Sequence, residues 1–281
     1  MRFLFILFSL VFLPTSSFTQ KKSNTFIQAK VFLKNKETQK AKNLIFKLYK
    51  QDSLSIKYSI FLGKIYAKEF KKDSSLYWLD KAKKLINPKT SPINLFQYYL
   101  WKGFTYEVNK NYDKALQNYF LAKKNIKNYT TIPDINLLYQ RVLLIYSEND
   151  HTDKVNHWIT TYTKIKDSIN NENFTNSYHN ALGNHYHYQK KASFANKEFD
   201  KSIYYSLKLK DSILLNNSYF HKGIIYAEYF KKQDSARHFY SLAKRVCNCP
   251  KSMLFNVTYK YNVSKTYFYE NNFLLAKKWL L

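Results

Sequence analysis

The stretch YYLWKGFTYEVNK, residues 98–110, carries a glycine in the middle of an aromatic, helical-looking segment. Three other stretches have the same form: YSIFLGKIYAKEF at 58–70, YHNALGNHYHYQK at 178–190 and YFHKGIIYAEYF at 219–230. Their glycines, Gly63, Gly103, Gly183 and Gly223, are the only four in the chain and are spaced by 40, 80 and 40 residues. Glycine inside a helix costs about 1 kcal/mol relative to alanine. Because a costly residue recurs at equivalent positions, we predict that a Cβ atom at these positions would clash with a closely packed second helix.

The same phase continues where glycine is absent. Leu143 fills the position between Gly103 and Gly183, and Ser264 fills the position after Gly223. Each of the six positions is followed three residues later by a tyrosine: Tyr66, Tyr106, Tyr146, Tyr186, Tyr226 and Tyr267. A constant period of 40 residues, once 41, is typical of a helical repeat array.

Small and aromatic residues recur in a fixed order within each period. One unit has Tyr99, Gly103, Tyr106, Ala115, Tyr119 and Ala122, and an earlier, weaker unit has Ala29, Phe32, Ala41, Ile45 and Leu48. This pattern resembles the tetratricopeptide repeat. The resemblance covers nearly all of the chain after residue 25. It implies an all-α fold, a right-handed superhelical solenoid of antiparallel helix pairs with about six and a half units.

Polar residues between the two helices of a unit predict helix caps. Asp73, Asn111 and Asn272 stand where their side chains could accept hydrogen bonds from free N–H groups of the second helix. The abundant tyrosine is then explained by packing between repeats and requires no aromatic ligand.

Composition and charge argue against an all-β fold and against a nucleic-acid partner. The chain has 4 glycines and 5 prolines in 281 residues, which disfavours an all-β fold rich in tight turns. The formal net charge of +27 invites a nucleic-acid hypothesis. Only four of the 46 basic residues are arginine, the residue best suited to phosphate and base contacts, and the lysines are dispersed over every repeat. We therefore expect a solvated lysine surface and no nucleic-acid partner.

The first residues have the form of a secretory leader. Arg2 precedes an apolar run from Phe3 to Leu13, which is too short to span a bilayer as a helix. Small residues follow, and they suit cleavage before Gln20. We predict a signal peptide at residues 1–19 and the repeat array at residues 20–281, with a location in the periplasm or cell envelope. A short retained membrane anchor is the alternative.

The sequence contains no recognisable combination of catalytic residues. The sequence has no Gly-rich phosphate loop, and His185 and His187 lie two residues apart, on different helix faces. Cys247 and Cys249, in the run CNCP, lack further ligands at metal-binding spacing. We expect no enzyme activity, no metal site and no cofactor.

The resemblance instead implies a binding groove lined by the first helix of each unit, with a protein or peptide as the ligand. Transferring the groove positions by phase gives Lys57, Ile60, Lys64, Gln97, Leu100, Phe104, Gln140, Leu144, Asn180, Asn184, Asn217, Phe220 and Ile224. The family's carboxylate clamp pairs lysine with asparagine, and no asparagine accompanies Lys57 and Lys64. The mixture of amides and apolar side chains favours an extended peptide held by side-chain amides.

The leading hypothesis is a non-catalytic binding scaffold outside the cytoplasm, the sensor portion of a membrane-linked transcriptional regulator or kinase. An envelope-assembly or uptake adaptor without signalling output is the alternative, and a basic nucleic-acid-binding array is a third. The apolar residues Trp279, Leu280 and Leu281 stand where a finished array would present a polar capping helix. We therefore expect an array truncated at residue 281, with a capping helix and a membrane link beyond it.

Overall fold

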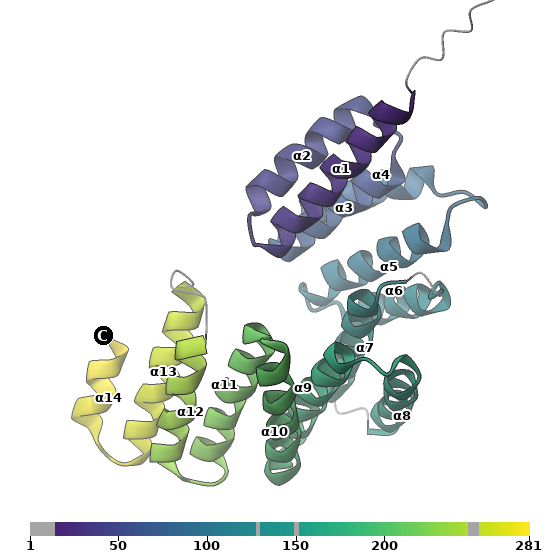
Figure 1. Cartoon of the computed structure of the whole chain (residues 1–281). Helices are drawn as coiled ribbons and strands as arrows, with labels where there is room; N and C mark the ends of the chain where they lie inside the picture. The colour runs from purple at the N-terminus through teal and green to yellow at the C-terminus, as the bar shows by residue number, and fades with distance from the viewer. Residues whose placement is uncertain (1–14, 128–129, 149–151, 247–252) are drawn as a thin grey trace, which may run out of the picture. The chain divides into compact units, whose positions relative to one another are not determined.

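The computed structural model describes residues 15–127, 130–148, 152–246 and 253–281. The chain forms two compact units, Met1–Asn128 (unit 1) and Tyr129–Leu281 (unit 2). All regular secondary structure in the described residues is α-helical, which confirms the predicted all-α class (Figure 1).

Within its described residues, unit 1 consists of three pairs of neighbouring helices. The pairs are α1 (Thr15–Lys34) with α2 (Thr38–Gln51), α3 (Ile56–Lys68) with α4 (Lys72–Leu85), and α5 (Pro92–Glu107) with α6 (Tyr112–Lys124). The weak N-terminal repeat, marked in the sequence by residues such as Ala29 and Ala41, thus forms a complete pair, in which both alanines are fully buried.

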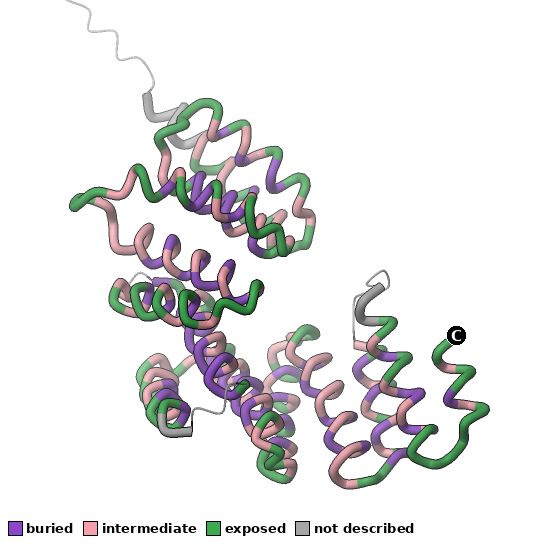
Figure 2. Tube along the Cα trace, turned by 180° about the vertical axis from the view of Figure 1, so that it is seen from behind, coloured by how far each residue is buried: buried purple, intermediate pink, exposed green. Residues whose placement is uncertain are grey.

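Unit 2 continues the arrangement with four pairs in the residues described. They are α7 (Ile132–Glu148) with α8 (Thr152–Ile169), α9 (Glu172–Tyr188) with α10 (Ala192–Leu209), α11 (Ser212–Glu228) with α12 (Gln233–Val246), and α13 (Met253–Tyr269) with α14 (Phe273–Leu280). The last helix has only eight residues. In both units the buried positions gather on the helix faces that meet a neighbouring helix (Figure 2).

The glycines lie where the facing helix of the pair leaves no room for a Cβ atom. A Cβ atom built on Gly63 would lie 2.7 Å from Leu79 Cγ, and one built on Gly103 would lie 2.7 Å from the ring of Tyr119. Gly183 and Gly223 face Phe199 and Tyr240 in the same way. Each partner belongs to the second helix of the same pair, so the predicted helix-packing role of the glycines is confirmed.

The α7–α8 pair packs without a glycine. Leu143 occupies the glycine phase and is buried. Three rings fill this pair, because the ring centroids of Trp158 and Tyr162 lie 4.9 Å and 5.3 Å from that of Tyr139 in stacked geometry. The Trp158 indole N–H also donates to the Tyr139 carbonyl at 3.0 Å.

The recurring tyrosines close the turn between the helices of a pair with their carbonyl groups. The carbonyls of Tyr66, Tyr106, Tyr186 and Tyr267 accept hydrogen bonds of 2.8–3.0 Å from the backbone N–H five residues later. The residue before that donor adopts a left-handed conformation, for example Lys110 with φ 58° and Lys190 with φ 56°. Glycine is usual at such a helix end. Here all four glycines are used inside helices, so lysine, phenylalanine or asparagine takes the strained position.

Side-chain caps are present at several helix starts. Asn111 accepts from the Lys114 N–H at 3.2 Å, and Asn272 accepts from the Leu275 N–H at 3.2 Å, as predicted. The prediction for Asp73 is wrong. The helix begins one residue before Asp73, so Lys71 is the N-cap residue of α4, and its side chain makes no capping bond because an ammonium group has no acceptor.

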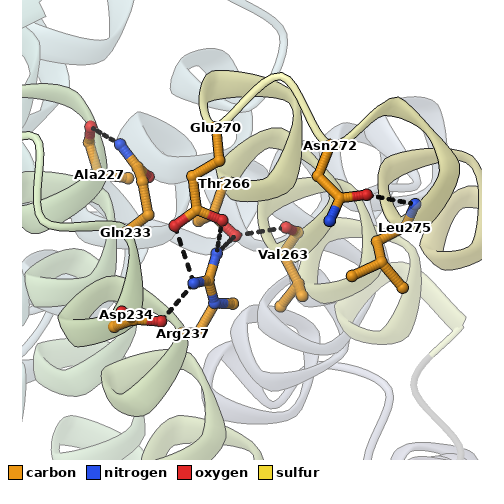
Figure 3. Close-up of polar contacts among 9 residues, drawn as sticks. All are labelled: Ala227, Gln233, Asp234, Arg237, Val263, Thr266, Glu270, Asn272 and Leu275. Carbon is orange, nitrogen blue, oxygen red and sulfur yellow. Dashed lines mark hydrogen bonds and ion pairs between the residues drawn. The ribbon is translucent and has the colours of Figure 1, made fainter.

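Polar contacts also tie successive pairs together, as they do between α12 and the C-terminal end of α13 (Figure 3). The Arg237 guanidinium donates two hydrogen bonds to Glu270, of 2.7 Å and 2.9 Å, and also pairs with Asp234. It lies 4.4 Å from the ring centroid of Tyr267 and 3.3 Å from Thr266 Oγ1. One arginine thereby joins the second helix of one pair to the first helix of the next.

The predicted leader and cysteines fall largely outside the described residues. Residues 1–14, Cys247 and Cys249 lie outside them, and α1 begins at Thr15, before the predicted cleavage position at Gln20. Among the helices that are described, none combines the length and the apolar character that crossing a bilayer requires.

Candidate functional site

In unit 1, three of the predicted groove residues belong to the core. Ile60, Leu100 and Phe104 are buried, with exposed fractions of 4%, 0% and 8%. The Phe104 ring packs edge-on against Trp101 at a centroid distance of 5.6 Å. These apolar side chains therefore stabilise unit 1 and present little surface to a ligand.

The polar groove candidates of unit 1 are held against aromatic rings. The Lys57 ammonium lies 5.2 Å from the Phe26 ring centroid, and that of Lys64 lies 4.7 Å from the Trp101 ring centroid. Gln97 Oε1 accepts a 2.9 Å hydrogen bond from the Trp101 indole N–H. Such cation–π and hydrogen-bonding contacts restrain all three side chains.

In unit 2, five predicted residues come together around one cavity of about 240 Å³, which we call the amide pocket. Its lining from α7, α9 and α11 comprises Gln140, Arg141, Leu144, Ser147, Asn180, Ala181, Asn184, His185 and Asn217. The predicted Phe220 and Ile224 do not line it. They pack instead on the core cluster that contains Tyr240, Tyr259 and Val263.

Three asparagines form the polar wall of the amide pocket. Asn180 Nδ2 donates to Asn217 Oδ1 at 2.9 Å, which joins α9 to α11. Asn184 Nδ2 makes a longer contact, 3.4 Å, with Asn180 Oδ1. Asn184 Oδ1 is buried and has no hydrogen-bond partner among the described residues. An unpaired buried acceptor costs about 1–3 kcal/mol, so a ligand donor that reached it would be favoured.

Other residues of the pocket tie α7 to α9. Gln140 Nε2 donates to the Ser177 carbonyl at 3.0 Å. The Ser147 hydroxyl donates to the Leu143 carbonyl at 2.6 Å, so the 2.8 Å contact between Ser147 Oγ and His185 Nδ1 requires Nδ1–H as the donor. His185 therefore holds the tautomer whose Nε2 is an acceptor.

Burial keeps this histidine neutral. The pKa of His185 is lowered to about 4, first by burial of the imidazole and second by the nearby charge of Lys191. Arg141 and His185 are the only lining residues with ionisable side chains, and no carboxylate lines the pocket. The site therefore offers amide and imidazole hydrogen-bonding groups, an arginine and an apolar patch from Leu144 and Ala181.

The repeat phase predicted the asparagines of the pocket but not the residues that hold them in place. Ser147 and His185 are also pocket residues, and their signal was position, since Ser147 lies one turn after the predicted Leu144 and His185 directly follows the predicted Asn184. The predicted separation of His185 from His187 is confirmed, because His187 meets His221 of α11 instead, with ring centroids 5.6 Å apart. Within the described part of the chain, no three His, Cys, Asp or Glu side chains are grouped to hold a metal ion.

Several proteins of known structure have a similar architecture. The chain superposes on RapI with a TM-score of 0.65 at 15% identity, over 92% of this chain and 74% of that one. It superposes on a STAND protein with a tetratricopeptide repeat sensor from Pyrococcus horikoshii with a TM-score of 0.67 at 15% identity. The fold is that of tetratricopeptide repeat proteins.

The latter match covers 93% of this chain but only 41% of the STAND protein. Aspartyl phosphate phosphatase F from Bacillus subtilis is similar with a TM-score of 0.65 at 14% identity, over 91% of this chain and 67% of that one. No protein-family model matches the sequence, and no curated protein matches it significantly. At these identities the likeness establishes the fold, a helical repeat scaffold.

Proposed function

We propose that this protein is a non-catalytic scaffold that binds an extended peptide segment in the amide pocket of unit 2. The observation that carries the proposal is the set of amide side chains that α7, α9 and α11 present to one cavity. Amides donate and accept hydrogen bonds and so match the alternating groups of a peptide backbone. The apolar contribution of Leu144 and Ala181 supplies surface for a neighbouring side chain.

A displayed random-peptide library tests this proposal. Peptides enriched on the native protein should bind at least about tenfold more weakly to an Asn217→Ala variant, because a hydrogen bond to the ligand is lost. Asn118→Ala is the matched control, since Asn118 is a half-buried amide of α6, outside the pocket, that bonds to the Lys114 carbonyl. Equal binding to all three proteins, or no enrichment at all, would contradict the proposal.

We further propose an extracytoplasmic sensor role. Two features support it: the apolar run at residues 3–13 with the form of a secretory leader, and the fold likeness to a protein whose repeats are described as a sensor. An envelope or uptake adaptor would share both the leader and the groove. Reading the gene beyond codon 281 separates the two proposals, because a sensor requires a membrane helix and an output domain.

A further inference from the structure

Tyr204 of α10 is a large aromatic residue that packing between repeats does not explain, because it is 63% exposed. Counted from the glycine phase, the equivalent position in four other repeats holds a basic residue: Lys84, Lys124, Lys164 and Arg245. A basic side chain at an exposed helix position is solvated, whereas an exposed tyrosine ring presents apolar surface. The α9–α10 pair therefore differs from the other pairs at this position.

The same pair also differs where its two helices meet. In the α11–α12 pair, Tyr219 and Phe239 stack with ring centroids 6.4 Å apart, and a tyrosine and a tryptophan stack at the equivalent positions of α7 and α8. In α9 and α10 these positions hold His179 and Glu198. His179 Nδ1 lies 2.6 Å from Glu198 Oε2, so a polar contact replaces the aromatic stack of the other pairs.

These two differences meet at a hollow of about 580 Å³ on α9 and α10, which we call the tyrosine hollow. It is lined by His179, Asp200, Lys201, Tyr204 and Tyr205. The ring of Tyr205 is nearly parallel to the His179 imidazole, with centroids 5.9 Å apart, and the Tyr204 ring meets it edge-on at 5.3 Å. Contacts with two other rings restrain Tyr205, so the aromatic surface is organised before a ligand arrives.

The charged groups that line the tyrosine hollow have partners within the protein. Glu198 accepts from His179 and, at 2.6 Å, from the Lys201 ammonium. Asp200 pairs with Lys222, a buried residue of α11. An ionic ligand would therefore compete with existing ion pairs. Ring faces and hydrogen-bonding groups remain for a ligand, because a carboxylate has several acceptor sites and a tyrosine hydroxyl both donates and accepts.

We propose that the tyrosine hollow binds a neutral oligosaccharide, with one sugar ring lying against Tyr204. The C–H groups on the face of a pyranose are apolar and weakly positive, so they fit the negative face of an aromatic ring. The hydroxyl groups at the edge of the same sugar donate and accept hydrogen bonds, which matches Asp200, Lys201 and the tyrosine hydroxyls. The tyrosine hollow is a second site that shares no lining residue with the amide pocket, so the inference goes beyond the proposed function.

Isothermal titration calorimetry of the full chain tests this inference. The probes are three neutral hexasaccharides, maltohexaose, cellohexaose and mannohexaose, with hexagalacturonate as the charged comparison. We expect at least one neutral hexasaccharide to bind, and to bind more tightly than hexagalacturonate. Tyr204→Lys should weaken that binding about tenfold or more, because it removes the ring against which the sugar lies. Three other repeats hold lysine at this position, so the variant should fold, which thermal melting checks.

Two further variants separate the contribution of the ring from other effects. Tyr204→Phe keeps the ring and loses only the hydroxyl, so its affinity should stay within about threefold of the native value. Tyr77→Lys is the matched control, because Tyr77 is another exposed tyrosine on the second helix of a pair, α4, and does not line the hollow. It should leave the affinity unchanged.

The inference would be overturned if none of the three neutral hexasaccharides bound, or if hexagalacturonate bound more tightly than they did. Undiminished binding to a folded Tyr204→Lys variant, or equal losses in Tyr204→Lys and Tyr204→Phe, would also overturn it. A library peptide whose binding depended on Tyr204 and not on Asn217 would identify the hollow as a protein-binding surface instead. None of these outcomes alters the test of the amide pocket, which depends on the response to Asn217→Ala.

Discussion

Replacing Gly183 by alanine tests whether close packing explains the repeated glycine, because the sign of the change in the free energy of unfolding depends on it. The added Cβ would lie 2.7 Å from both Cδ1 and Cε1 of Phe199 and 2.9 Å from its Cζ, whereas ordinary van der Waals contacts are 3.4–4 Å. The Phe199 ring is fully buried with Ala195 and Ile225, and the His221 ring stacks on it at 5.4 Å. The ring therefore has no free space into which it can retreat.

Two opposing contributions set the change in the free energy of unfolding. Alanine gains about 1 kcal/mol over glycine in helix propensity. Overpacking a filled core costs about 1–3 kcal/mol. We expect Gly183→Ala to lower the free energy of unfolding by up to about 2 kcal/mol, measured by urea denaturation. Gly103→Leu should cost several times more, because its Cβ would also lie 3.2 Å from the backbone oxygen of Ala115.

A double-mutant cycle with Phe199→Ala identifies the clash as the cause. With the ring removed, Gly183→Ala should become stabilising by about 1 kcal/mol, since only the propensity gain remains. A stabilised Gly183→Ala single variant, or an additive cycle, would refute the close-packing explanation for the repeated glycine.

Other predictions concern charge, backbone strain and processing. Burial lowers the pKa of His185 to about 4 and also lowers that of His187. Below pH 6.5 these histidines are therefore protonated in the unfolded state but stay neutral in the native state. The free energy of unfolding should therefore fall as the pH drops from 6.5 toward 4, and His185 alone should account for about 2 kcal/mol of the loss at pH 5. A His185→Gln variant, compared by denaturation at pH 7 and pH 5, should lack that part of the pH dependence. Lys190→Gly should raise the melting temperature by relieving a φ of 56°, with a gain of about 0.5–1 kcal/mol, and a lower melting temperature would contradict it. Binding to duplex or single-stranded DNA should be weak at physiological salt, and a submicromolar affinity that falls steeply with salt would show that the basic surface is functional. N-terminal sequencing of the exported protein should start at or near Gln20, and recovery of intact Met1 in membranes would disprove cleavage.

The repeat period and the role of the glycines were determined by the sequence itself. A residue that is unfavourable in a helix recurs at one phase only where the structure needs it, so Gly63 and its equivalents located the contact between paired helices before the fold was known. The family likeness, the all-α class and the amide-lined first helices followed from the same phase.

Tertiary structure decided which of those helix positions remain available to a ligand. Leu100 and Asn180 occupy similar positions in their repeats, yet Leu100 is fully buried in unit 1 while Asn180 lines a cavity in unit 2. Asn180 Nδ2 donates to Ser218 Oγ, which in turn donates to Ser202 Oγ, and these two serines lie 16 residues apart and meet only when α10 and α11 pack. Repeat phase identifies the helix face that a residue occupies, but hydrogen-bond direction depends on partners from other helices, and only the folded chain brings them together.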